Sequence, residues 1–240
     1  MLPTGAVHVV VRLEGPLRLY RDAADLSGFD VGHALVGGAR SGPYLRDVAR
    51  PSSSVGAQLR PGAAALLFGL PSHELAERHT RLDELFGSEA RRLEERLAEA
   101  RDPSHRLDVF EAFLASKLDG KRLDPLVVHA LERFDERVPL GAIVEESGYS
   151  HRHFIDRFRR AVGLSPKLHA RVLRFQRALR LMKTPSSLAR IALDAGYSDQ
   201  AHFTREFREL AGISPSHHRA LAPPNANHVP WVKSFQDEGA

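Results

Sequence analysis

The side chains best suited to chemistry fall on two short segments with helical spacing. In the first segment, the residues at positions i, i+3, i+4 and i+7 are Arg152, Ile155, Asp156 and Arg159. In the second segment, the residues at the same intervals are Ala201, Thr204, Arg205 and Arg208, and Gln200 lies at the edge of this row. Residues at these intervals share one face of a helix. Each segment therefore presents a row of basic, polar and small side chains.

These residue types can recognise the edges of DNA bases. Arg can bind guanine O6 and N7 with two hydrogen bonds, Gln can pair with the adenine edge, and Ala or the Thr methyl group can contact the thymine methyl group. Any one of these side chains could equally be solvated surface. The residue types alone therefore indicate a helix face that is suited to contacting DNA bases.

The positive charge of the chain is concentrated around these segments. Residues 1–120 hold 15 Lys and Arg against 17 Asp and Glu, whereas residues 121–240 hold 19 against 13. Between Ser150 and Lys183 there are ten basic residues and one acid, Asp156. A solvated helix face usually mixes both signs, so this run favours a polyanionic partner.

Both segments belong to an internal repeat. Gly148-Tyr149-Ser150 in the first copy corresponds to Gly196-Tyr197-Ser198 in the second. Four further residues recur 49 positions later, as Phe203, Phe207, Gly212 and Pro215 after Phe154, Phe158, Gly163 and Pro166. A repeat of this kind predicts two copies of one structural unit.

Each copy has the pattern of a helix, a tight turn and a second helix. The first helices are expected at 140–147 and 188–195, closed by Gly148 and Gly196, where a left-handed backbone is favourable for glycine. The following helix can be capped by Ser150 in the first copy, and by Ser198 or Asp199 in the second. The Phe pairs face inward, so the polar rows face outward.

A continuous helix is predicted between the copies, from Pro166 to Met182, before Thr184-Pro185. It would be about 25 Å long at 1.5 Å per residue. Successive major grooves on one face of B-DNA lie about 34 Å apart. We hypothesise that this helix and the two units span that distance, so that one chain reads two grooves of double-stranded DNA.

The first half of the chain has a different pattern. Strand candidates at 7–13, 17–20, 29–36 and 55–59 are separated by Gly and Pro turns. From Leu82 the apolar period becomes helical, and Asp102-Pro103 begins a second helix, which gives a helical hairpin. Its apolar stripe is expected to pack either on the β unit or on a second copy of the chain. The apolar residues around Val9, Val11 and 63–68 are expected to be core.

The patterns together predict an α+β protein in three parts, divided at the turn Gly120-Lys121-Arg122. Residues 1–120 form a small, mainly-β unit with the helical hairpin, and residues 121–222 form an all-α domain with two helix-turn-helix motifs. Residues 223–240 are a tail, in which Trp231 and Phe235 either anchor it to a domain or belong to a disordered segment.

The stretch from Leu123 to Leu221 resembles the DNA-binding domain of the AraC/XylS transcription regulators. The likeness is strongest at Ile191-Ala192, from Gly196 to Phe207, and at Gly212-Ile213-Ser214-Pro215. The resemblance implies two recognition helices, at about 150–162 and 199–211, in adjacent major grooves. It implies base contacts by Arg152, Ile155, Asp156, Gln200, Ala201, Thr204 and Arg205. Phosphate contacts are expected from Ser150, Arg159, Arg174, Ser198 and Arg208.

The first motif departs from the family at Asp156, where the family often has a basic residue. A carboxylate is repelled by phosphates, although it can accept a hydrogen bond from cytosine N4. Arg157 could partly substitute. Base contact by the recognition helix of the second motif is therefore expected more firmly than base contact by that of the first.

The N-terminal half resembles the cupin-like sensor domain of one branch of this family. The likeness lies in Leu2-Pro3-Thr4-Gly5, in the run from Arg60 to Ala65, and in Phe235-Gln236-Asp237. In that branch, sequence usually precedes the Leu-Pro-x-Gly phrase, so the β unit is expected to be incomplete. A sensor domain implies a small-molecule effector, a homodimer, or both, although no effector residue can be named. RNA polymerase is a further candidate partner.

Enzymatic chemistry is not indicated. The chain has no cysteine, which excludes thiolate metal sites, cysteine nucleophiles and methyl transfer to cysteine as in DNA repair. A cupin-type metalloenzyme would use His8, His33, His73, Glu74 and His79, but none falls at a diagnostic metal spacing. We expect no enzyme activity, no metal and no cofactor. An architectural DNA binder without sequence preference remains the alternative.

The sequence also predicts a bacterial protein of the cytoplasm without a membrane partner. No apolar run approaches the roughly 18 residues needed to cross a bilayer. The start of the chain lacks the basic and apolar regions of a signal peptide.

Overall fold

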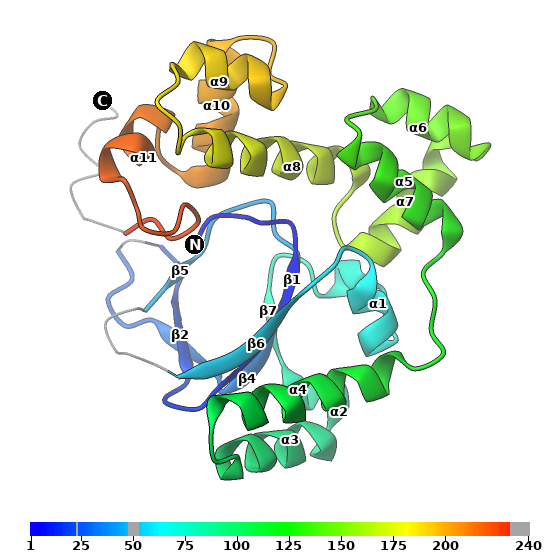
Figure 1. Cartoon of the computed structure of the whole chain (residues 1–240), viewed down its shortest axis with the longest axis vertical. Coiled ribbons are helices and arrows are strands. Elements are labelled where there is room, and N and C mark those ends of the chain that lie inside the picture. The colour runs from blue at the N-terminus through cyan, green and yellow to red at the C-terminus, as the bar shows by residue number, and fades with distance from the viewer. Residues whose placement is uncertain (23, 48–52, 231–240) are drawn as a thin grey trace.

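A computed structural model describes residues 1–22, 24–47 and 53–230 of the chain (Figure 1). Its N-terminal part holds two antiparallel sheets. The larger sheet has the strand order β6 (Ser54–Leu59), β1 (Val7–Arg12), β4 (Ala34–Gly37) and β7 (His79–Arg81). The smaller sheet has the order β3 (Phe29–Gly32), β2 (Leu17–Tyr20) and β5 (Leu45–Arg46). The predicted mainly-β unit is therefore confirmed.

Strand β1 separates two environments because its side chains alternate between the two faces of the sheet. Val7, Val9 and Val11 are buried in a core that they share with helices. On the other face, His8 and Arg12 line a pocket.

One segment differs from the sequence-based expectation, and one that was expected to be core proves to be helical. The strand predicted at 29–36 is two strands of different sheets, β3 and β4, because the chain turns between them at Gly32, whose φ of 124° suits glycine. Residues Ala63–Phe68 form a helix, α1, whose Ala64 and Leu67 are buried in the core.

The predicted helical hairpin packs on the β unit. It consists of α2 (Leu82–Phe86), α3 (Ser88–Glu99) and α4 (Pro103–Leu118). The Asp102 carboxylate caps α4 by accepting the backbone N–H of His105 at 2.9 Å. Leu93, Leu97 and Phe110 are buried with the valines of β1. The apolar stripe of the hairpin therefore packs on the β unit, which is one of the two packing partners expected for it.

The second half is helical and is organised around one long helix, α8 (Pro166–Leu181). Before α8 lie α5 (Pro125–Asp135), α6 (Leu140–Ser147) and α7 (His151–Val162). After it lie α9 (Leu188–Ala195), α10 (Gln200–Ala211) and α11 (Pro215–Leu221). Separate hydrophobic cores form around Phe154 and Phe158 and around Phe203 and Phe207. The two predicted helix-turn-helix units are thus present at the two ends of α8 (Figure 1).

The β unit and the helical half share packing surfaces. Leu164 and Val172 of the helical half belong to the core of the β unit. The Ser72 hydroxyl, on the short 3-10 helix Ser72–Glu74, donates to the Ala161 carbonyl of α7 at 2.7 Å. Leu2, only 3% exposed, lies in the core of the second helix-turn-helix unit. The packing therefore runs across the boundary predicted at Gly120, and the division of the chain there stays a prediction.

Candidate nucleic-acid interface

The two turns have the backbone that the repeat predicts. Gly148 and Gly196 end α6 and α9 in the left-handed region, with φ of 70° and 96°. The Ser150 hydroxyl accepts the backbone N–H of His153 and so caps α7. In the second copy the cap is Asp199, which accepts the N–H of His202 at 2.7 Å. Ser198, the other candidate, donates to the Asp199 carboxylate.

The inward Phe pairs fix how each recognition helix is rotated. Phe154 and Phe158 of α7, and Phe203 and Phe207 of α10, each have 0% exposed surface. Because these side chains fill the two cores, the opposite faces of α7 and α10 must point away from the cores.

Most of the side chains expected to contact bases or phosphates are exposed. On the described surface of α7 and α10 these are Arg152, Asp156, Arg159, Gln200, Ala201, Arg205 and Arg208, together with Ser150 and Ser198 in the preceding turns. Ile155 and Thr204 are half-buried, and the Thr204 hydroxyl donates to the Gln200 carbonyl at 2.8 Å. The structure thus brings together one polar row on each recognition helix.

Arg157 is bound to a neighbouring helix and does not offset the charge of Asp156. Its Nε donates to the Asp124 carboxylate at 2.8 Å, and its guanidinium lies 5.3 Å from the centre of the Tyr149 ring. Hydrogen bonding to Asp124 raises the pKa of Arg157. The negative charge of Asp156 on the α7 face is therefore not neutralised by Arg157.

Arg174, expected to contact phosphate, is held by an acid that the sequence analysis did not single out. Its Nη2 donates to the Glu206 carboxylate at 2.7 Å and 2.9 Å, and its guanidinium lies 4.8 Å from the centre of the Tyr197 ring. Arg171 donates to the same carboxylate at 2.9 Å. Phosphate contact by Arg174 stays a prediction, and the observed role of Arg174 is to join α8 to α10.

The carboxylate of Glu206 is nearly buried, with 6% of the residue exposed. Burial disfavours its charged form, yet hydrogen bonds from Arg174 and Arg171 outweigh burial and hold the pKa of Glu206 below its ordinary value. The spacing of two arginines at i and i+3 on α8 is the sequence signal that could have indicated a carboxylate partner.

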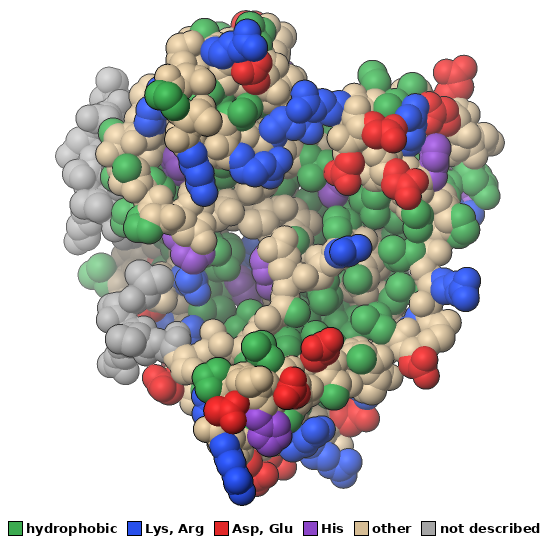
Figure 2. Space-filling view, in the orientation of Figure 1, with side chains coloured by type: hydrophobic (Ala, Val, Ile, Leu, Met, Phe, Trp, Pro, Cys, Tyr) green, Lys and Arg blue, Asp and Glu red, His purple; other side chains and the backbone are tan. Residues whose placement is uncertain are grey.

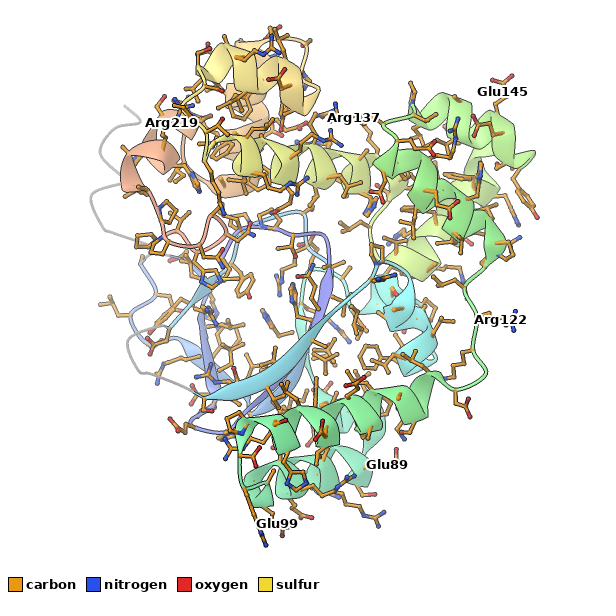
Figure 3. All side chains as sticks on the ribbon, in the orientation of Figure 1. Glu89, Glu99, Arg122, Arg137, Glu145 and Arg219 are labelled. Atoms are coloured by element: carbon orange, nitrogen blue, oxygen red, sulfur yellow. The ribbon has the colours of Figure 1, made fainter. Side chains whose placement is uncertain are left out.

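The remaining basic side chains of this region form a positive surface. Among the described residues no ion pair is found for Arg152, Arg159, Arg160, Lys167 or Arg180. Lys and Arg side chains gather over α8 and the second helix-turn-helix unit (Figure 2), and Arg137 lies beside α8 (Figure 3). An extended basic surface of this kind attracts the phosphates of nucleic acid.

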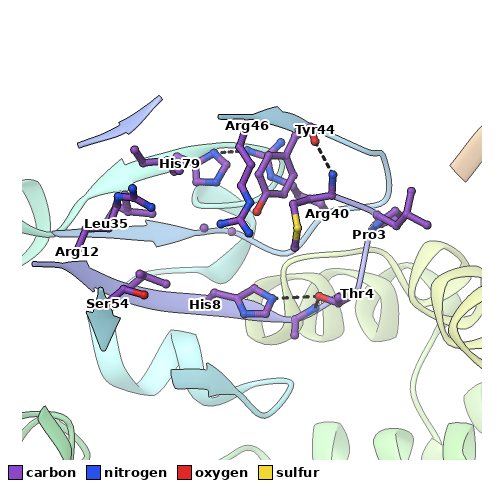
Figure 4. Close-up of a pocket in the computed structure, with 17 residues that line it drawn as sticks. Pro3, Thr4, His8, Arg12, Leu35, Arg40, Tyr44, Arg46, Ser54 and His79 are labelled. Carbon is purple, nitrogen blue, oxygen red and sulfur yellow. Dashed lines mark hydrogen bonds between the residues drawn. The ribbon is translucent and has the colours of Figure 1, made fainter. Parts of the chain in front are cut away.

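Neither a metal site nor a membrane span is found in residues 1–22, 24–47 and 53–230. No three side chains of the ligand types converge in that part of the chain. Of the five residues weighed as ligands, His8 and His79 line the pocket of the β unit (Figure 4), while His33, His73 and Glu74 do not. No helix there is both long enough and apolar enough to cross a bilayer. Trp231 and the phrase Phe235-Gln236-Asp237 lie outside the described residues.

Two helix-turn-helix units on one shared helix, with their polar faces outward, define a double helix-turn-helix domain of the DNA-binding class. A family described as "Helix-turn-helix domain" matches residues 143–220. The helical half is therefore similar to helix-turn-helix transcription regulators, as its resemblance to the AraC/XylS family implies. Residues 1–81 match a second family, described as "Domain of unknown function (DUF6597)".

Curated relatives match the helical half. The HTH-type transcriptional regulator MtrA of Neisseria gonorrhoeae is 31% identical over 100 residues, which are 41% of this chain and 33% of MtrA. The MmsAB operon regulatory protein of Pseudomonas aeruginosa is 31% identical over 98 residues, which are 40% of this chain and 32% of that protein. The matched part thus spans about a third of the length of these curated relatives.

Solved structures also align with the chain. An AraC-type transcriptional regulator domain from Chromobacterium violaceum has 27% identity and a TM-score of 0.38, and covers 42% of this chain and 96% of that chain. ToxT from Vibrio cholerae has 12% identity and a TM-score of 0.48 over 91% of each chain.

Proposed function

We propose that the protein is a sequence-specific transcription regulator that inserts α7 and α10 into adjacent major grooves of double-stranded DNA. The observation that carries this proposal is the outward polar row on each recognition helix, held at opposite ends of α8. With 16 residues, α8 is about 24 Å long at 1.5 Å per residue. The adjacent-groove spacing is about 34 Å, which α8 and the bodies of the two units can bridge.

The second helix is proposed as the main reader of sequence. Gln200, Ala201 and Arg205 are exposed on α10 and have the residue types that distinguish base edges. On α7 the exposed Asp156 would be repelled by phosphates, so that helix is proposed to select cytosine at one position or to contribute mainly through Arg152 and Arg159.

Selection of DNA from a random pool by the purified chain, followed by footprinting, tests this proposal. We expect an enriched site whose protection covers two successive major grooves at one chain per site. Protection of one groove only would reject the arrangement of the two helices.

An architectural role without sequence preference is the alternative. It predicts no enriched site and an affinity that falls steeply with salt for every sequence. Enrichment of one site in the selection rejects this alternative.

We further propose that the β unit regulates the DNA-binding half, through a small-molecule effector, a homodimer, or both, without catalysing a reaction. We also propose that the protein contacts RNA polymerase and that it resides in the cytoplasm. The regulatory role of the β unit is supported by the packing of Leu164, Val172 and Ala161 against the β unit, because this packing gives the two halves a route for mutual influence.

A further inference from the structure

The second recognition helix is tied to α8 by an arginine, a carboxylate and a tyrosine. Nη2 of Arg174 on α8 donates to the Glu206 carboxylate of α10 at 2.7 Å, and the Arg174 guanidinium lies 4.8 Å from the centre of the Tyr197 ring. Arg171 donates to the same carboxylate. Both Tyr197 and Glu206 are buried. This contact is therefore shielded from water and has two arginines for one carboxylate.

The first recognition helix has the same three groups with the two charges exchanged. Position 157 precedes position 206 by the 49 residues of the repeat, and it holds an arginine where the second copy holds a glutamate. Nε of Arg157 donates to the carboxylate of Asp124, the N-cap residue of α5, at 2.8 Å. Nη1 of Arg157 donates to the Tyr149 hydroxyl at 3.3 Å. In each copy, an ion pair thus joins the recognition helix to the helix that precedes the motif.

The two ion pairs differ in burial. The side chains of Arg157 and Asp124 are 35% and 26% exposed, whereas that of Glu206 is 7% exposed. A half-exposed ion pair contributes little to stability, because water screens the charges and both side chains lose freedom. Loss of the Arg157–Asp124 pair should therefore leave the chain folded. A role of this pair in orienting α7 can then be separated from a role in stability.

Asp124 belongs to a linker that is bound to the β unit. The linker comprises residues 119–124, between α4 and α5. Nζ of Lys121 donates to the Leu66 carbonyl of α1 at 2.7 Å. The Leu123 side chain lies against Gly62, where a Cβ atom would be 2.7 Å from Leu123 Cδ2. The carboxylate that binds Arg157 is therefore held in place relative to the β unit.

We propose that Asp124 and Arg157 are positioning residues for DNA reading by α7. The ion pair sets the rotation of α7 about its axis, and hence the direction of its exposed polar row, from the linker and the β unit. Base contacts require side chains to be held within about 0.5 Å and 10–20° of the productive geometry. The first half of the DNA site should depend on this pair, whereas α10 is oriented separately by Glu206. The DNA readout rests on the proposed function.

Asp124→Asn removes the charge and keeps the helix cap. An asparagine oxygen can still accept the backbone N–H of Leu126, which Asp124 accepts at 3.0 Å. Asp119→Asn is the matched control, because it removes an equal charge from an exposed position of the same linker. Each purified full chain selects DNA from a random pool, and base preference is measured at every position of the site. The half that Arg205→Ala alters is the half read by α10.

We expect Asp124→Asn to reduce base discrimination in the α7 half of the site by roughly 2- to 30-fold. The α10 half should be unchanged, and Asp119→Asn should select the wild-type site. A merely structural role would weaken binding to both halves alike. An equal loss in the two halves, or no change in either, therefore overturns the proposal.

A double-mutant cycle shows whether the two residues act as a unit. Arg157→Gln should reproduce the effect of Asp124→Asn, and Arg157→Lys, which keeps the charge, should retain more of the discrimination. The variant with both Asp124→Asn and Arg157→Gln should be no worse than either single variant. Additive losses, or a loss in Arg157→Gln that is equal for every DNA sequence, would show that Arg157 binds phosphate itself and would reject its positioning role.

Hydrogen exchange tests the orientation of α7 without DNA. Asp124→Asn should quicken exchange of the backbone amides of α7 and leave those of α10 unchanged, because α10 has its own buried pair. Unchanged exchange in α7 rejects the positioning role. If the wild type selects no site while exchange in α7 responds as expected, the DNA function fails and the positioning contact stands. If the wild type selects a site that Asp124→Asn leaves unaltered, only the positioning role fails.

Discussion

Arg205 and Arg208 are both exposed on α10 and are predicted to act differently on DNA. Arg205→Ala should cost about 1–3 kcal/mol at one base position, because a bidentate contact with guanine would be lost. Arg208→Ala should weaken binding to all sequences alike, because a phosphate contact carries no sequence information. Affinity measured over a randomised site separates the two. A uniform loss in both variants would remove the assignment of a reading face.

Arg174→Ala is predicted to destabilise the second helix-turn-helix unit. The substitution leaves the nearly buried Glu206 carboxylate with Arg171 as its remaining close arginine. The loss of charge-assisted hydrogen bonds should lower the free energy of unfolding by roughly 1–3 kcal/mol. Urea unfolding measures it, and Glu206→Leu in the same background should restore part of the loss. Wild-type stability of Arg174→Ala would contradict this role.

His169 makes the stability depend on pH. Burial between Phe134 and Phe158 lowers the pKa of His169 from 6.5 to about 4. Between these values the unfolded chain binds a proton that the folded chain does not, so stability is complete above pH 6.5 and falls as the pH approaches 4. The contribution is up to about 3 kcal/mol.

Urea unfolding at several pH values between 7 and 4 should show this decrease. His169→Leu should make the decrease smaller, although His79, whose pKa is also lowered to about 4, keeps part of it. His151→Leu, at an exposed position on α7, is the matched control. An unchanged slope in His169→Leu would mean that His169 is not the group responsible.

At the scale of elements, the turn glycine Gly196 should tolerate no side chain without strain. Its φ of 96° is unfavourable for other residues, so Gly196→Ala should destabilise by about 1–2 kcal/mol. Gly141, inside α6, has ordinary helical backbone and open space at its Cβ position. Gly141→Ala should therefore stabilise, by up to about 1 kcal/mol. Thermal unfolding measures the change in stability of each variant. A change in the same direction for both variants would refute this explanation.

The elements of the helical half were predictable from the sequence because their signals are local. The glycines, caps and Phe pairs of the repeat specify turns and inward faces within a few residues, and the structure has them. The break between β3 and β4 was not predicted, since the segment from Phe29 to Val36 contains no proline and the turn at Gly32 depends on pairing with two different sheets.

The candidate site was predictable in its exposed rows but not in its internal ion pairs. Which basic residues meet a carboxylate depends on partners distant in sequence, as Arg157 with Asp124 and Arg174 with Glu206 show. The pocket of the β unit was not predicted either, because Arg40, Arg46 and His79 come together only when two sheets face each other.

At the scale of the whole molecule, Leu2 should stabilise a unit that lies at the other end of the sequence. Leu2 packs in the core of Phe175, Ile191 and Phe207. Leu2→Ala should lower the free energy of unfolding by about 2–4 kcal/mol, as for other buried leucines. Hydrogen exchange should quicken in α9 to α11 more than in α5 to α7. Faster exchange confined to the β unit would show that Leu2 does not support the second unit.

The position of Leu2 also bears on how the protein is made. During synthesis this residue emerges long before the helices whose core it completes, so the second unit cannot close its core while the chain is still short. Contacts between such distant parts raise contact order and slow folding. A fragment that begins after residue 120 would lack Leu2 and would expose an apolar gap where Leu2 packs in the full chain. Cutting the protein into two halves would therefore leave the core of the second helix-turn-helix unit incomplete.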